Sequence, residues 1–141
     1  MINAETILVL ITTFIASITD VKSRIIPNSL LIFASLISLI ISGNRGINIL
    51  IIRVMVAIFT FFVLYIFVYK KGYLPGGDVK ALVFLILALG PQLFSEMFGY
   101  LAISTIPVMV YYLIRKGESS IPYALPMFMG SLALIVQGLL L

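Results

Sequence analysis

The chain has 141 residues, of which 62% are hydrophobic and 10% are charged, and its formal net charge is +4. A soluble domain of this size needs more polar surface to cover its core, so this composition excludes a soluble domain and predicts a membrane protein. Cysteine and histidine are both absent, which excludes disulfides, cysteine nucleophiles, serine triads and the commonest zinc ligands. Any hydrolytic chemistry must use carboxylates, lysine or backbone groups.

Six apolar runs follow one another, and they leave no room for a separate soluble domain. They cover residues 7–19, 29–41, 47–69, 79–89, 93–114 and 123–141. The second and fourth runs are short for a full bilayer crossing, so flanking residues must complete them. Residues 1–5 carry no basic segment, so we expect the first run to be retained rather than removed as a signal peptide. The pattern predicts an all-α, polytopic membrane protein of about six transmembrane helices.

The positive charges indicate an orientation in the membrane. The segments after the first, third and fifth runs, together with the start of the fourth run, hold seven of the nine basic residues: Lys22, Arg24, Lys70, Lys71, Lys80, Arg115 and Lys116. Arg45 and Arg53 fall on the other side. Because basic loops stay in the cytoplasm, both termini are predicted outside, N-out and C-out. The net charge therefore reflects orientation, and no nucleic-acid partner is expected because the chain has no basic domain or reading motif.

Five acidic residues occur in the chain, and two of them stand out by position. Asp20 and Asp78 each lie where an apolar run meets a turn-forming segment at the predicted cytoplasmic edge. An ionisable group at membrane depth is costly, and it is therefore a functional candidate. Glu5 and Glu96 are interpreted as solvated carboxylates at the outer helix ends, and Glu118 as a solvated loop residue beside basic neighbours.

Each aspartate also has a purely structural interpretation. Asp78 follows Gly76 and Gly77 at the start of the fourth run, where an aspartate can cap the helix. Asp20 can end the first helix and pair with a nearby basic residue. The two glycines let another backbone or a substrate strand approach closely. Lys80 is either a membrane anchor or a residue that tunes the acids.

Considered together, Asp20 and Asp78 indicate acid–base catalysis. Two carboxylates in a partly dehydrated site cannot both ionise easily, so one keeps its proton near neutral pH. The ionised partner can deprotonate a water molecule that attacks a peptide carbonyl, while the protonated partner donates to the carbonyl oxygen. This chemistry needs neither histidine nor thiol, and we expect no metal and no cofactor.

Three segments carry a resemblance to a known family. Residues 20–28 (Asp-Val-Lys-Ser-Arg-Ile-Ile-Pro-Asn) and 76–80 (Gly-Gly-Asp-Val-Lys) resemble the two aspartate motifs of type IV prepilin peptidases. These enzymes are polytopic aspartic proteases with a Gly-x-Gly-Asp signature. Residues 121–126, with Gly130 after them, resemble the segment before their last span. Pro75 stands at the first glycine of the signature and Ala124 at another usual glycine, so the chain departs from the pattern there.

The resemblance implies that residues 1–141 form a single transmembrane peptidase domain with Asp20 and Asp78 as the catalytic pair. The implied supporting or substrate-binding residues are Gly76, Gly77, Lys80, Pro27 and Asn28. The implied substrate is a pilin-like precursor with a short basic leader and a hydrophobic helix, cut at the cytoplasmic edge of the plasma membrane.

Because it is short and has no cysteine, the chain resembles the peptidase-only members of the family. These members serve Flp/Tad pili or archaeal pilins and archaellins. A small ion-coupled carrier and a non-catalytic assembly subunit are the alternatives. Carriers place acids near the middle of the bilayer on broken helices, whereas both aspartates here lie at predicted membrane edges.

Overall fold

The computed structural model describes residues 3–71, 76–116 and 121–140, apart from the side chains of residues 115 and 116. The regular structure in these ranges is helical, which confirms the predicted all-α class. The elements are α1 (Ala4–Ser23), α2 (Asn28–Arg45), α3 (Ile47–Leu64), the π-helix η1 (Tyr65–Tyr69), α4 (Gly76–Lys116) and α5 (Ala124–Leu140).

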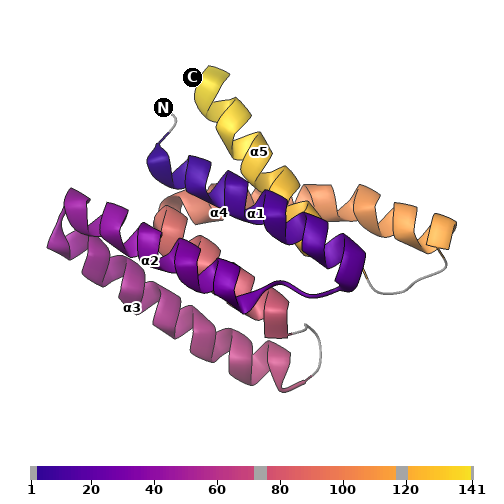
Figure 1. Ribbon diagram of the computed structural model, residues 1–141, viewed down its shortest axis with the longest axis horizontal. Helices are drawn as coiled ribbons and strands as arrows, with labels where there is room; N and C mark the ends of the chain where they lie inside the picture. Colours follow the sequence, from indigo (N-terminus) through magenta and orange to yellow (C-terminus); the bar gives the residue numbers. More distant parts are fainter. Residues whose placement is uncertain (1–2, 72–75, 117–120, 141) are drawn as a thin grey trace.

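Helix α4 consists of two helices joined at Gly90, which has a non-helical φ of 75° and ψ of 168°. The chain reverses direction at this point (Figure 1). The break falls between the fourth and fifth apolar runs of the sequence, just before Pro91. A Cβ atom at residue 90 would lie 3.0 Å from Nε of Arg53, so both the backbone conformation and the available space favour glycine.

Within the described residues, four helices are long and apolar enough to cross a membrane: α1, α2, α3 continued by η1, and α4. Helix α5 is apolar but shorter. The predicted short second run becomes an 18-residue helix because α2 continues to Arg45. These features indicate a multi-pass membrane protein. The count of six crossings and the outside location of both termini stay predictions.

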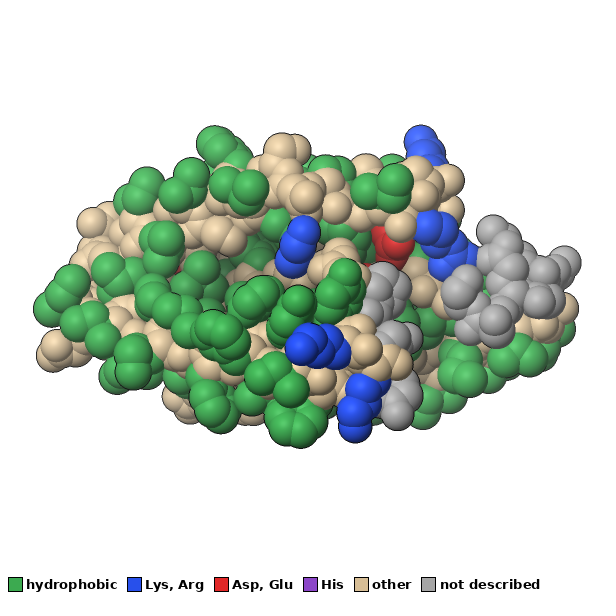
Figure 2. Space-filling model, turned by 90° about the horizontal axis from the view of Figure 1, so that it is seen from below, with side chains coloured by type: hydrophobic (Ala, Val, Ile, Leu, Met, Phe, Trp, Pro, Cys, Tyr) green, Lys and Arg blue, Asp and Glu red, His purple; other side chains and the backbone are tan. Residues whose placement is uncertain are grey.

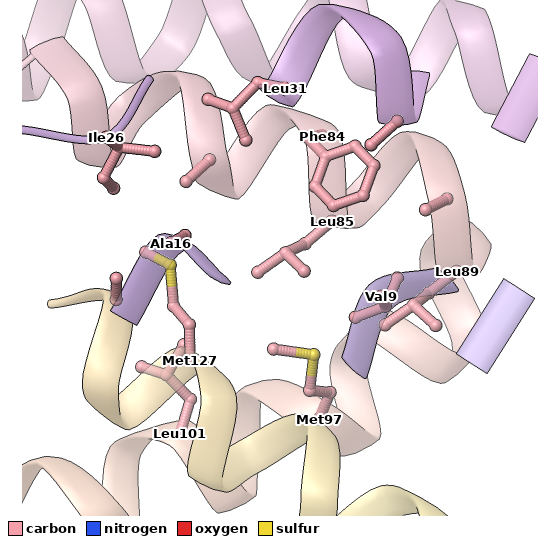
Figure 3. Close-up of a cluster of buried hydrophobic side chains, with 14 of the residues drawn as sticks. Val9, Ala16, Ile26, Leu31, Phe84, Leu85, Leu89, Met97, Leu101 and Met127 are labelled. Atoms are coloured by element: carbon pink, nitrogen blue, oxygen red, sulfur yellow. The ribbon is translucent and has the colours of Figure 1, made fainter. Parts of the chain in front are cut away.

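The hydrophobic core joins α1, α4 and α5, and Leu31 and Ala34 of α2 also belong to it. Val9, Leu85, Leu89, Met97 and Met127 are each at most 3% exposed. In Figure 3 these side chains face a common space between the helices. Burying such side chains is the main source of stability where helices pack, so this core sets how the ends of the three helices are placed.

Helix α5 packs closely against α4 and α1. A Cβ atom at Gly130 would lie 3.1 Å from the backbone nitrogen of Leu101 and 3.3 Å from the carbonyl oxygen of Met97. A side chain here would be tighter than an ordinary contact, so glycine favours the close approach of the two helices. Thr13 Oγ1 and Ser131 Oγ lie 2.9 Å apart and form a hydrogen bond between α1 and α5. This packing places the start of α5 beside the end of α1.

A buried ion-pair network holds the other end of α1. Glu5 is 0% exposed, and its carboxylate lies 2.6 Å from Arg53 and 2.9 Å from Arg45. Arg53 Nη1 also donates to Ser42 Oγ at 2.9 Å and to the carbonyl oxygen of Ala88 at 2.8 Å. The expectation that Glu5 is a solvated carboxylate is therefore wrong, because side chains from α2 and α3 cover and neutralise it.

The network marks one end of the helix bundle. It joins the start of α1, the end of α2, the first half of α3 and the end of the first half of α4. In Figure 1 these points lie on the same side of the molecule as both chain termini. The end of α1, the start of α2 and the start of α4 lie on the opposite side, and these carry the two aspartates.

Candidate active site

Asp20 and Asp78 line one cavity at the end of the bundle opposite the ion-pair network. The cavity has a volume of about 370 Å³ and is lined by Asp20, Arg24, Ile25, Ile26, Asn28, Gly77, Asp78, Lys80 and Ile121. Each aspartate is 6% exposed, and the two carboxyl groups are close enough for their charges to interact. Figure 2 shows an acidic patch beside Lys and Arg side chains on a largely apolar face.

Asp20 lies in the last turn of α1, because the helix continues past it to Ser23. Its Oδ2 atom accepts a hydrogen bond from the backbone N–H of Ala124 at 3.0 Å. Ala124 is the first residue of α5, so this N–H is one of the free donors at the positive end of a helix. The contact holds the Asp20 side chain in place and stabilises negative charge on it.

Asp78 lies in the first turn of α4 rather than before it. The positive end of α4 favours a negative charge at this position. The neighbouring Val79 is 2% exposed, so packing of the first turn fixes the direction in which Asp78 points. Pro75 precedes this helix and, like Glu118, lies outside the described residues.

The two glycines before Asp78 are helical. Neither Gly76 nor Gly77 has a positive φ, so their backbone conformation does not demand glycine. A Cβ atom at Gly77 would have its nearest neighbour at 3.8 Å, an ordinary contact, whereas one at Gly76 would lie 3.3 Å from the Tyr69 ring. Gly77 lines the cavity, and its missing side chain leaves space beside Asp78.

Arg24 forms part of the cavity wall between α1 and α2. It adopts a left-handed conformation with φ of 56°, and its N–H donates to the carbonyl oxygen of Asp20 at 2.9 Å. The guanidinium group lies 5.2 Å from the ring centre of Tyr112, within the range of a cation–π interaction. Arg24 therefore connects the end of α1 to the second half of α4.

Asn28 and Lys80 form another part of the wall. Lys80 Nζ donates a hydrogen bond to Asn28 Oδ1 at 3.2 Å, which joins the start of α2 to the start of α4. Pro27 is the N-cap residue of α2, where its fixed φ suits the turn into the helix. Pro27 is not among the lining residues of the cavity.

The structure gathers five of the residues that the sequence singled out around this cavity: Asp20, Asp78, Gly77, Lys80 and Asn28. Gly76 and Pro27 are their sequence neighbours and do not line the cavity. Two features were missed. The sequence indicates a positive charge at Arg24 but not its place in the cavity wall. The Ala124 N–H gives no sequence signal because every residue except proline has one.

Both aspartates lie in a part of the chain that a known family shares. The sequence model of the type IV leader peptidase family matches residues 7–114. The chain belongs to this family. Neither the comparison with curated proteins nor the comparison with solved structures finds a match. Membership confirms the predicted resemblance to leader peptidases, and it supports a protease activity. The α5 residue that contacts Asp20 lies beyond the matched region.

Proposed function

We propose that the chain is an aspartic endopeptidase that removes the leader peptide of type IV pilin-like precursors at the cytoplasmic edge of the plasma membrane. The observation that carries the proposal is the shared cavity of about 370 Å³, which Asp20 enters from α1 and Asp78 from α4. Membership of a leader peptidase family supports it. Two carboxyl groups can hydrolyse a peptide bond without the histidine and cysteine that the chain lacks.

The surroundings of the two carboxyl groups assign them different starting roles. Asp20 accepts the N–H of Ala124 and lies in the field of Arg24, and both stabilise a negative charge. Asp78 lies in the field of the like-charged Asp20, which disfavours a second negative charge. The positive N-terminal end of α4 opposes this effect, but we expect the direct hydrogen bond from Ala124 to Asp20 to outweigh it, because charge-assisted hydrogen bonds are the strong ones. Asp20 therefore starts as the base and Asp78 as the acid.

In the proposed reaction, Asp20 takes a proton from a water molecule whose oxygen attacks the carbonyl carbon of the scissile bond. Asp78 gives its proton to the carbonyl oxygen, which produces a neutral tetrahedral diol. Asp20 then gives its proton to the leaving nitrogen, the C–N bond breaks, and Asp78 recovers a proton from a diol hydroxyl group. The products are a carboxylic acid and an amine, and both aspartates return to their starting states.

The direct test is cleavage of a pilin-like precursor by the purified chain in lipid vesicles. We expect the precursor to lose its leader, with the new N-terminus identified by mass spectrometry, and we expect the rate to be unchanged by EDTA. A precursor that stays full length would contradict the proposal, and accumulation of a solute in the vesicles would favour a carrier. A loss of activity in EDTA that a divalent metal restores would contradict the two-aspartate mechanism.

Replacing Ala124 with Pro is expected to slow cleavage about 10- to 100-fold, because a hydrogen bond to a charged group contributes ~1.5–3 kcal/mol. Proline lacks the N–H that Asp20 accepts, and it is tolerated at the first position of a helix. The measurement is kcat at saturating precursor. Ala124→Gly keeps the N–H and serves as the matched control, and equal losses in the two variants would contradict the role of this donor.

A further inference from the structure

An apolar groove adjoins the candidate catalytic cavity. It lies between α2, α3 and the first half of α4 and has a volume of about 430 Å³, within the ~300–1,000 Å³ range of ligand sites. Asn28 and Lys80 line both the groove and the cavity. Their hydrogen bond of 3.2 Å forms the border between the two spaces, so a chain that leaves the cavity across this pair enters the groove.

The walls of the groove are apolar stripes that begin at this border. Leu31, Ser35 and Leu36 line it from α2, and Val83 and Leu87 line it from α4. Residues three and four apart lie on one face of a helix, so each helix presents a continuous stripe to the groove. The lined segments, residues 28–36 and 80–87, extend about 10–12 Å from the border at the rise of an α-helix.

We propose that this groove binds the hydrophobic helix that follows the leader in the precursor, an inference that rests on the proposed peptidase function. The bond to be cut must lie at Asp20 and Asp78, so the residues on one side of it must leave the cavity. The groove shares two residues with the cavity, and its apolar walls match an apolar helix. The Asn28–Lys80 pair then marks the change from the polar leader to the membrane-embedded helix.

A second apolar groove provides an internal control. It lies between α4 and α5, has a volume of about 670 Å³, and shares no lining residue with the catalytic cavity. Ala133 lines this groove as Ser35 lines the first. Both are small, half-buried helical residues. The same substitution at these two positions therefore separates docking beside the catalytic cavity from general effects of altering an apolar groove.

The first experiment uses the absence of cysteine from the chain. Ser35→Cys and Ala133→Cys are introduced separately into the Asp78→Asn variant, so that bound precursor is not consumed. Single cysteines are placed along the helix of a pilin-like precursor in the same vesicles, and copper phenanthroline is the oxidant. We expect about tenfold more disulfide-linked product at Ser35→Cys than at Ala133→Cys, at precursor positions three or four residues apart.

Equal cross-linking at the two positions, or none at Ser35→Cys, would overturn the groove proposal. A dimer of the chain linked through Ser35→Cys without precursor would show that a second copy covers the groove, and would also overturn it. Cleavage by the unaltered chain is measured in parallel. If the unaltered chain cleaves the precursor but Ser35→Cys does not cross-link to it, only the groove proposal is overturned, and lipid then covers the groove. If the unaltered chain does not cleave the precursor, the proposed peptidase function itself is contradicted.

The second experiment fills the groove. Ser35→Phe is expected to lower kcat/KM about tenfold for the full precursor and less than about twofold for a short peptide that ends soon after the scissile bond. Ala133→Phe is expected to leave both values within about twofold. Equal losses for both substrates in Ser35→Phe would place the effect in the catalytic cavity and overturn the proposal.

Discussion

Replacing Asp78 with Asn is expected to lower the rate of precursor cleavage at least about 10³-fold, because general acid–base catalysis contributes ~10²–10⁴ per group and the two carboxyl groups act as a unit. An amide cannot supply the proton that the proposed reaction gives to the carbonyl oxygen. Asp20→Asn is expected to have a similar effect because it removes the base. The variant that carries both Asp20→Asn and Asp78→Asn should cleave the precursor no more slowly than either single variant. Single-turnover cleavage in vesicles measures all three rates.

The same substitutions are expected to leave thermal stability unchanged or to raise it. Both carboxyl groups are largely buried, and burial together with the Asp20 charge disfavours ionisation of Asp78 in the folded state but not in the unfolded chain, so an amide removes a cost of folding. In Asp20→Asn the amide oxygen can still accept the Ala124 N–H. Glu96→Gln, which alters an exposed carboxylate outside the cavity, is the control. Normal cleavage by both aspartate variants would disprove the catalytic pair.

The central residues of the site were predictable from the sequence. Asp20 and Asp78 interrupt an apolar chain at the ends of runs, and charge at such positions is costly enough to indicate a function. Asn28 and Lys80 belong to the same short motifs, and the structure places them together. Their hydrogen bond was not predictable, because nothing in either motif specifies how the start of α2 lies against the start of α4.

Other parts of the site depend on the backbone, which the sequence does not describe directly. The left-handed conformation of Arg24 arises where the chain leaves α1, a position usually given to glycine or asparagine. The donor to Asp20 is the main-chain N–H of Ala124, which only a proline would lack. The π-helix at Tyr65–Tyr69 lies inside the apolar run 47–69, whose pattern is equally compatible with an α-helix.

The helix boundaries show why an apolar pattern underestimates helix length. It ends the first run before Asp20 and the second before Ser42, yet both residues lie inside helices. Each has a buried partner: Asp20 accepts from Ala124, and Ser42 accepts from Arg53. A polar residue with such a partner can continue a buried helix, but the partner becomes visible only in the folded chain. Glu5 is predicted to be solvated for the same reason, because its partners Arg45 and Arg53 are identified only in the folded chain.

Replacing Arg53 with Met is expected to lower the free energy of unfolding by about 3–5 kcal/mol, the usual effect of removing one partner from a buried ion pair. Glu5 is fully buried and, in the part of the chain that the structure describes, would keep only Arg45 as an ionic partner. Ser42 and the Ala88 carbonyl would also lose the donor that they share. Thermal and denaturant unfolding of the purified chain in detergent measure the change.

A double variant separates the charge of this network from its packing. Glu5→Gln combined with Arg53→Met leaves no buried acid in the ion-pair network, so it is expected to be more stable than Arg53→Met alone. Arg45→Met is the matched control, because the Arg45 side chain is 36% exposed and Glu5 keeps Arg53 in that variant. The loss of stability in Arg45→Met should be clearly smaller than in Arg53→Met.

Since the network lies at the end of the bundle away from the aspartates, cleavage per folded molecule should stay unchanged in all three variants. Equal stability of Arg53→Met and the double variant would show that packing of the Arg53 side chain, rather than its charge, holds the four helices together at this end.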